Sequence, residues 1–261
     1  VIKYKIPKCT IGCLDPFKEV DGKGVEKLKN AGVDVEYGIL ESECRELNKR
    51  FFTFHTKHRP YISLKWAQTA DGFIAVPGQE RLFISNGYSN RLVHQWRSEE
   101  AAILVGTGTA LMDDPELTTR LWPGTSPLRL VIDMDLKLPS SQKIFNAQAP
   151  TLIFNAIRHS QNSQPGYYQL TRDVNLVQQI CHSLYQMKVQ SILVEGGARL
   201  LQSFIDEGMW DEARVITNTQ MRTGRAGRGL PAPVLTGTLK TNEMKLQNDL
   251  VEFFKNSCYT Y

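Results

Sequence analysis

The chain has 261 residues, of which 41% are hydrophobic and 22% charged, the composition of an ordinary soluble globular protein. Its apolar runs fall well short of the ~20 residues that a membrane-spanning helix needs. Its net charge is only +4, without a basic stripe interleaved with aromatic residues. We therefore expect neither a membrane nor a nucleic-acid partner, and a small anionic ligand suits the charge balance better.

Five cysteines, an odd number at wide spacing, predict reduced thiols in a cytoplasmic protein. The close pair Cys9 and Cys13 alternates with apolar residues, which favours a buried strand over a metal site. None of the five histidines falls in an H-x-E or H-E-x-x-H pattern, and G-x-S-x-G is absent. The sequence thus predicts no metal site and no common serine hydrolase. Because the chain starts at Val1 rather than Met, we expect a fragment or a disordered start.

The first predicted unit spans residues 1–56 and is read as strand, helix, strand, helix. The expected elements are strands at 9–17 and 33–40 and helices at 25–32 and 41–54. Gly32 is expected to end the first helix, and the basic stretch 55–60 is interpreted as a linker. This unit is too short to form both a full core and an active site.

The second predicted domain spans residues 59–261. Short β-branched runs predict buried, mainly parallel strands at 61–68, 101–106, 128–133, 151–155 and 191–197. Alternating patterns predict edge-closing strands at 211–220 and 249–261, and amphipathic patterns predict helices at 89–99, 175–187 and 198–209. Ser85-Asn86 is the candidate cap of the first of these helices. Strands that alternate with helices predict an α/β domain.

Polar groups follow or end several of the predicted strands: Lys65, Asp133 and the run Glu195-Gly196-Gly197. Ligands of open α/β sheets bind beyond the carboxyl ends of the strands, so these groups are site candidates. Two glycines before a helix let backbone N–H groups approach a phosphate. A plain turn that uses glycine for its positive φ would give the same letters.

The stretch VGTGTAL, residues 105–111, lacks the third glycine of a dinucleotide fingerprint. Thr107 and Thr109 in it fit either a phosphate contact or a helix cap. The pair Asp113-Asp114 that follows fits either an acid/base site or a solvated helix end. Two arginines, at 97 and 120, fit either an anion clamp or an ordinary surface role.

Four segments occur in the order and spacing of one family: RPYISLKWAQTADGFIA, AAILVGTGTALMDDPELTTR, PLRLVID and SILVEGGARLLQSFIDEGMWDEARV. On these motifs, residues 59 to about 215 resemble the reductase domain of the bifunctional deaminase/reductase family of riboflavin biosynthesis. The resemblance implies an α/β, dihydrofolate-reductase-like mixed sheet with flanking helices. Residues 1–56 resemble the C-terminal end of the preceding deaminase domain, which implies a partial cytidine-deaminase-like α/β segment.

In this family the zinc-binding motifs of the deaminase lie upstream of the stretch that matches residues 1–56. The resemblance therefore implies that Val1 begins after the zinc site and that deamination is expected only in a full-length protein. NADPH is the implied cofactor, a phosphorylated pyrimidine the implied substrate, and a homodimer the implied assembly. The family's reductase converts 5-amino-6-(5-phosphoribosylamino)uracil into its ribityl product, opening the ribose ring and adding hydride at C1′.

Matched motif by motif, the resemblance places Lys65 and Asp113 near the reacting centre, and which of them donates the proton stays open. The implied substrate-binding residues are Arg81, Arg97, Leu117, Arg120 and Glu195. The implied cofactor-binding residues are Ala67, Phe83, Thr109, Asp113, Met134, Gly197, Ala198, Arg199, Leu200, Leu201, Gln202 and Ser203.

Three of these positions depart from the family pattern. Arg81 stands where a small polar residue is frequent, Phe83 replaces a tryptophan, and Met134 replaces a hydroxyl residue. Two alternatives stay open: a related reductase that acts on a pterin or another pyrimidine, and a nucleotide-binding module without catalytic activity. The set Lys65, Asp113, Arg120 and Glu195 favours an enzyme.

Overall fold

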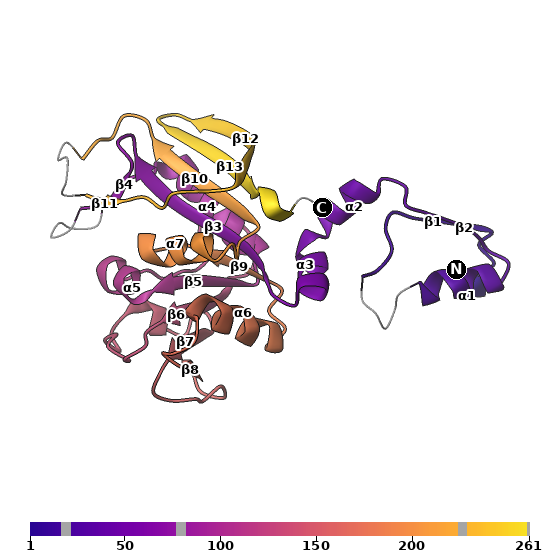
Figure 1. The fold of residues 1–261 in the computed structure, drawn as a ribbon, viewed down its shortest axis with the longest axis horizontal. Coiled ribbons are helices and arrows are strands. Elements are labelled where there is room, and N and C mark those ends of the chain that lie inside the picture. Colours follow the sequence, from indigo (N-terminus) through magenta and orange to yellow (C-terminus); the bar gives the residue numbers. More distant parts are fainter. Residues whose placement is uncertain (17–21, 77–81, 224–228, 260–261) are drawn as a thin grey trace. The chain divides into compact units, whose positions relative to one another are not determined.

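Two units, Val1–Tyr61 and Ile62–Thr260, make up the computed structural model, which describes residues 1–16, 22–76, 82–223 and 229–259 (Figure 1). The boundary predicted from the sequence lies between residues 56 and 59. What domain the first unit represents stays a prediction.

The first unit contains a small parallel sheet and three helices. Its elements are the 3₁₀ turn Ile2–Tyr4, β1 Lys8–Ile11, α1 Lys23–Asn30, β2 Asp34–Tyr37, α2 Glu41–Leu47 and α3 Lys49–Lys57. β1 pairs with β2 in parallel register. Gly32, at φ +78°, follows the last turn of α1 and lets the chain reverse there, as predicted.

The single helix predicted at 41–54 and the linker predicted at 55–60 are both wrong in part. The helix is broken at Asn48, whose φ of −103° and ψ of 20° leave the helical region. Its side-chain amide donates to the Cys44 carbonyl oxygen at 2.9 Å, a local bond that competes with a continuous helix. The following helix continues to Lys57 and ends at His58, which adopts left-handed φ, before Pro60.

The second unit is built on a nine-stranded sheet in the order β12-β13-β10-β3-β9-β5-β6-β7-β8 (Figure 1). Its large-sheet strands are β3 Tyr61–Thr69, β5 Ala102–Gly106, β6 Leu128–Ile132, β7 Thr151–Asn155, β8 Gly166–Gln169, β9 Ser191–Val194, β10 Glu212–Asn218, β12 Thr238–Leu246 and β13 Asp249–Asn256. The pairings from β9 through β8 are parallel, as is β10 with β3, and β13 pairs antiparallel with β10 and β12.

The helices of this unit are α4 Gly87–Glu99, α5 Thr107–Asp113, α6 Leu176–Gln186 and α7 Ala198–Asp206, with 3₁₀ turns at Lys143–Phe145 and Ser257–Tyr259. A two-stranded sheet joins β4 Phe73–Ala75 to β11 Leu230–Pro231. Asn86 caps α4 as predicted, because its side chain accepts hydrogen bonds from the Tyr88 and Ser89 backbones. β4, β8, β11 and β12 were not predicted.

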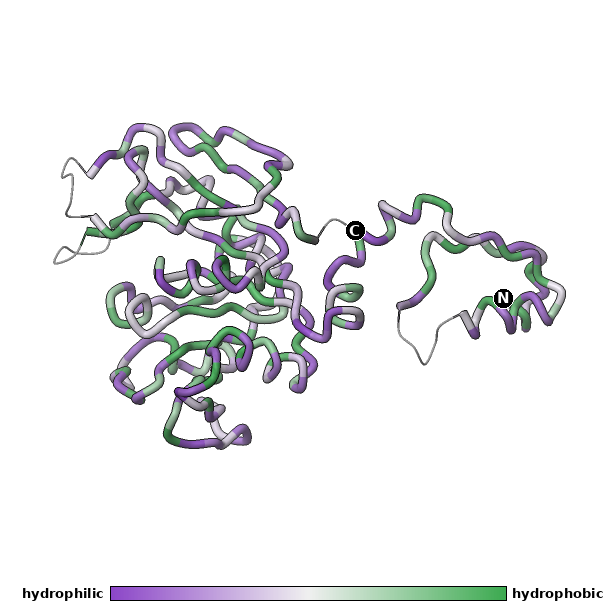
Figure 2. The backbone as a smooth tube through the Cα atoms, in the orientation of Figure 1, coloured by the Kyte–Doolittle hydropathy of each residue, from purple (hydrophilic) through white to green (hydrophobic). Residues whose placement is uncertain are grey.

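β5 shows why the sheet is buried on both faces. Its residues Ala102, Ile103, Leu104 and Val105 are all fully buried. Because strand side chains alternate, Ala102 and Leu104 join the cluster that contains α6 and α7 residues, whereas Ile103 and Val105 join one that contains Ala110 of α5. A third cluster packs Val93 and Trp96 of α4 beside sheet residues. In Figure 2 much of the backbone of the large sheet is coloured as hydrophobic, in keeping with its buried residues.

The predicted fold class, an α/β mixed sheet with flanking helices, is confirmed for the second unit. Because β9 and β5 are parallel neighbours, the loops that follow them lie at the same edge of the sheet. The cytidine-deaminase-like character of the first unit stays a prediction.

Candidate active site

Glu195 is the central residue of the candidate site. It follows β9, and its backbone N–H donates to the Leu104 carbonyl of β5 at 3.0 Å, which fixes the turn to the sheet. Its carboxylate is 6% exposed and accepts two hydrogen bonds from Arg97, Nε to Oε1 at 2.8 Å and Nη2 to Oε2 at 2.7 Å. The Lys65 ammonium from β3 lies 4.0 Å from Oε2. Three predicted residues from separate elements therefore meet in one charged cluster.

This cluster is electrostatically coupled. Burial favours the neutral acid, but the positive charges of Arg97 and Lys65 and the Arg97 hydrogen bonds outweigh it and lower the pKa of Glu195 to about 2. Burial opposes the charged form of Arg97 as well, and the Glu195 carboxylate overcomes this and raises the pKa of that guanidinium. The pair is thus ionised, and the Lys65 ammonium lies beside it.

Helix α4 presents two site residues one turn apart. Arg97 lies in its last turn and also donates from Nη1 to the Thr118 carbonyl at 3.2 Å. His94, three residues earlier and on the same face, accepts a hydrogen bond at Nδ1 from the Arg120 backbone at 2.9 Å. Both contacts reach the loop after α5, which carries two of the predicted substrate residues, Leu117 and Arg120.

The residues predicted in that loop are placed differently from one another. Asp113 ends α5 and is partly buried, whereas Asp114 takes a left-handed φ of 39° and accepts a bond from the Lys143 backbone. Leu117 is buried in the core cluster beside Ile103. Its side chain therefore packs into the core, and its contact with a substrate stays a prediction. The Arg120 side chain is 49% exposed and bonded to the Glu116 carboxylate at 2.6 Å.

The glycine turn after β9 packs against α5. A Cβ atom on Gly196 would lie 2.9 Å from Thr109 Cγ2, so only glycine fits there, and Gly197 adopts φ +72°. The nine-residue helix α7 begins after Gly197 and has no side chain that caps its N-terminus. Its first backbone N–H groups therefore point out of the helix without an intrahelical acceptor. The structure brings Thr109 and the glycine turn together, and their role toward a cofactor stays a prediction.

The other predicted cofactor residues vary in accessibility. Leu200 and Leu201 are buried, Gln202 bonds Asp206, and Ser203 donates to the Leu200 carbonyl. Arg199 and Phe83 are exposed, whereas Ala67, Met134 and Ala198 are partly buried. Arg81 lies outside the described residues. The ligand contacts of all these positions stay predictions.

Thr107 and Asp133, both site candidates from the sequence, form hydrogen bonds with backbone groups of the fold. The Thr107 hydroxyl donates to the Ile132 carbonyl at 2.5 Å, so it ties the start of α5 to the end of β6. Asp133 is buried, and its carboxylate accepts from the Leu138 backbone at 2.9 Å. Both side chains hold the strand ends in place.

Sequence reasoning missed two buried residues that hold the loop after α5, His94 and Arg129. Arg129 lies in β6, is fully buried, and donates to the Glu116 carbonyl at 3.3 Å and to the Ala149 carbonyl at 2.5 Å. His94 occurs in none of the matched family segments, and Arg129 lies in one of them without having been singled out. An arginine inside an apolar strand, in PLRLVID, is the signal that could have identified the second one.

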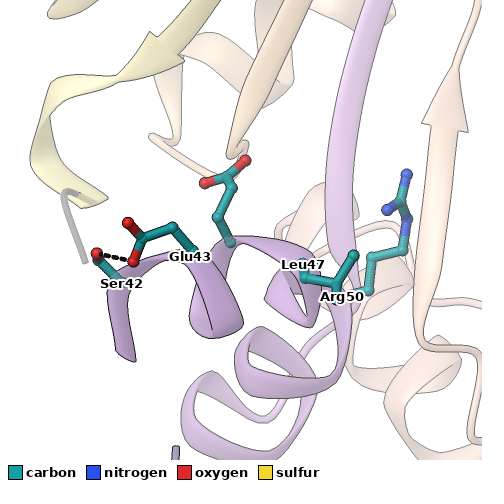
Figure 3. A pocket seen from close by; sticks show the side chains of 5 residues that line it. Ser42, Glu43, Leu47 and Arg50 are labelled. Atoms are coloured by element: carbon teal, nitrogen blue, oxygen red, sulfur yellow. Dashed lines mark hydrogen bonds between the residues drawn. The ribbon is translucent and has the colours of Figure 1, made fainter. Parts of the chain in front are cut away.

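A separate hollow lies on helices α2 and α3 of the first unit. Its lining residues are Ser42, Glu43, Glu46, Leu47 and Arg50 (Figure 3). None of the predicted site residues borders it. Among the residues that the structure describes, no group of three or more His, Cys, Asp or Glu side chains could hold a metal ion. No helix in the described ranges is long and apolar enough to cross a membrane.

The comparisons with known proteins identify the family. Residues 60–249 match the model of the RibD C-terminal domain. The riboflavin biosynthesis protein RibD of Aquifex aeolicus is 37% identical over 98% of the chain and 74% of its own length. The chain belongs to the RibD family. The RibD protein of Actinobacillus pleuropneumoniae is 30% identical, and the chain spans 65% of its length.

Solved RibD structures share the fold over nearly the whole chain. One is the diaminohydroxyphosphoribosylaminopyrimidine deaminase/5-amino-6-(5-phosphoribosylamino)uracil reductase of Thermotoga maritima, with a TM-score of 0.85 and 30% identity over 98% of this chain and 73% of that one. RibD of Acinetobacter baumannii gives a TM-score of 0.86 and 25% identity over 97% and 74%. Membership in this family makes the chain an oxidoreductase of riboflavin biosynthesis.

Proposed function

We propose that this RibD chain reduces 5-amino-6-(5-phosphoribosylamino)uracil to the 5-phosphoribitylamino product with NADPH. The observation that carries the proposal is the buried cluster of Glu195, Arg97 and Lys65 beside the glycine turn of α7. The name of the Thermotoga relative includes this reductase activity. The substrate carries a phosphate and a polar pyrimidine, and the positive charges of Arg97 and Lys65 complement the phosphate.

The residues at the start of α7 fit a dinucleotide cofactor. The close approach of Gly196 to Thr109 and the uncapped N-terminus after Gly197 leave backbone donors for a pyrophosphate. Residues 197–203 and Thr109 would hold it. When bound, NADPH would supply the hydride for C1′ of the opened ribose.

The chain's own residues would orient the sugar and handle the proton. Lys65 and Asp113 are our candidates for charge and proton handling, because an ammonium or a protonated carboxyl can donate to a sugar oxygen. Glu195, itself held by Arg97, would accept hydrogen bonds from substrate hydroxyl or amide groups. Arg97 and Arg120 would attract the phosphate.

The other expectations for the whole protein are proposals as well. We propose a homodimer in the cytoplasm, by resemblance to the family. By the same resemblance, deamination is expected only in a full-length protein that carries the zinc ligands.

The test is NADPH oxidation by the purified chain with the ribosylaminouracil phosphate, and separately with dihydrofolate. The proposal expects turnover with the first substrate only, and less turnover when NADH replaces NADPH. Turnover of dihydrofolate alone would assign the chain to pterin reduction. Tight binding of NADPH and of the ribosylaminouracil phosphate without turnover would indicate a non-catalytic module.

A further inference from the structure

Three side chains from other elements form hydrogen bonds with the backbone of the loop 116–120, at every second residue of the loop. Arg129 donates to the Glu116 carbonyl at 3.3 Å, and Arg97 donates to the Thr118 carbonyl at 3.2 Å. Arg129 is fully buried, and the Arg97 side chain is 12% exposed. At the first two of these residues, Glu116 and Thr118, an arginine side chain therefore donates to the backbone carbonyl oxygen.

At the third residue, Arg120, the direction of the hydrogen bond is reversed, because the backbone is the donor. His94 is 6% exposed, and its Nδ1 accepts the backbone N–H of Arg120 at 2.9 Å. A nitrogen that accepts a hydrogen bond carries no proton, so the ring must be neutral for this contact. Burial and the nearby charges of Arg97, Arg120 and Lys65 lower the pKa of His94 to about 4, and only the Glu195 carboxylate opposes them. The ring is thus kept in the state that the contact needs.

The side chain of Arg120 is oriented from the same loop. Its Nη1 donates to Glu116 Oε2 at 2.6 Å and to Thr118 Oγ1 at 2.9 Å. His94 fixes the backbone of Arg120, whereas these two groups fix its guanidinium. A side chain that is half-exposed yet held at both ends is pre-organised, which lowers the entropy cost of binding an anion.

We propose that His94 is a positioning residue for substrate binding: its unprotonated Nδ1 fixes the Arg120 backbone and so directs the Arg120 guanidinium toward the phosphate of the substrate. This inference rests on the proposed function, because it takes Arg120 as a phosphate-binding residue. His94 itself needs no contact with the substrate.

The test compares two substitutions of this histidine. His94→Leu has a similar size but no acceptor, and it leaves the Arg120 N–H unpaired. His94→Asn places an amide oxygen near the position of Nδ1 and is the matched control. We expect His94→Leu to raise KM for the ribosylaminouracil phosphate about tenfold, with kcat and the KM for NADPH little changed. His94→Asn should restore most of the affinity.

The substitutions His94→Leu and His94→Asn are then each combined with Arg120→Ala. There the guanidinium is absent, so His94→Leu should add little to the KM effect. An equal rise of KM with and without Arg120 would overturn the inference, because it would show that the histidine acts by general packing. A parallel loss of kcat and of NADPH affinity would overturn it as well.

Failure of the proposed function is recognised separately, as a wild-type chain that does not reduce the ribosylaminouracil phosphate. In that case calorimetric titration with ribose 5-phosphate, and exchange protection of the Arg120 amide, still decide the inference. Weaker binding and lost protection in His94→Leu, both restored in His94→Asn, support it. Unchanged binding in His94→Leu refutes it.

Discussion

Glu195 and Arg97 share two parallel hydrogen bonds, at 2.8 and 2.7 Å, in a site where both side chains are almost fully buried. The two residues are 98 positions apart in the chain, so the pair joins helix α4 to the turn after β9. A bidentate pair of this kind fixes the orientation of both groups. It therefore sets the position of the carboxylate that is proposed to face the substrate.

Removal of Arg97 should be costly for stability. Arg97→Met leaves the Glu195 carboxylate buried with Lys65 at 4.0 Å as its remaining described cation, so the free energy of unfolding should fall by about 3–5 kcal/mol. Arg120→Met removes an exposed ion pair and should cost about 1 kcal/mol or less. Urea unfolding at neutral pH measures both. Equal losses in the two variants would contradict this account of the buried pair.

Lys65 and Asp113 are predicted to act in catalysis. Lys65→Ala and Asp113→Asn should lower the single-turnover rate of reduction by about 10²–10⁴-fold, the range typical of a general acid or base, with a smaller effect on folding. Asp114→Asn is the matched control, because Asp114 binds the Lys143 backbone, and asparagine can accept the same bond. If both test variants reduce substrate at the wild-type rate, neither residue has the proposed role.

The turn between β9 and α7 gives a third prediction. Gly196→Ala would place a methyl group 2.9 Å from Thr109 Cγ2, so the turn must shift and the KM for NADPH should rise about tenfold, equivalent to roughly 1.4 kcal/mol. Gly108→Ala, in α5 with open space around it, should leave that KM unchanged. Adding Thr109→Ser removes the clashing methyl and should recover part of the loss. A normal KM in Gly196→Ala would show that the cofactor binds elsewhere.

Much of the sheet could be predicted from the sequence, because buried parallel strands are continuous apolar runs. The run 102–105 is one such strand, and the Asn86 cap is likewise a local signal. β12 was missed because it is an edge strand whose residues are mostly exposed and polar. The break at Asn48 was missed because it depends on one side-chain bond inside a helical pattern.

The sequence indicated which residues belong to the candidate site, but not how they are arranged in space. The motifs indicated Lys65, Arg97 and Glu195, but no local pattern shows that a strand and a helix bring the two cations within 4.0 Å of the Glu195 carboxylate. Leu117 was expected at the substrate, and the structure buries its side chain. His94 carries no motif, since its role comes from a contact 26 residues away with the Arg120 backbone. Such tertiary contacts have no signature in a single sequence.

The low pKa of His94 gives the last prediction, on the pH dependence of stability. In the unfolded chain this group binds a proton below about pH 6.5, the ordinary value for histidine. In the folded chain burial, together with Arg97 and Arg120, delays protonation until about pH 4. Between these values the unfolded state binds more protons, so the contribution of His94 to stability falls as the pH drops through that window.

His94→Asn has no titratable group at this position and should not show that part of the decline. The free energy of unfolding, measured with urea at steps between pH 7 and pH 4, should therefore fall more steeply for the wild type than for His94→Asn. Below pH 4.5 both proteins should weaken further, since the lowered pKa of Glu195 stabilises the fold only while that carboxylate is ionised. Parallel curves from pH 6.5 to 4 would mean that His94 is protonated in the folded chain. The acceptor contact with Arg120 would then be absent at those pH values.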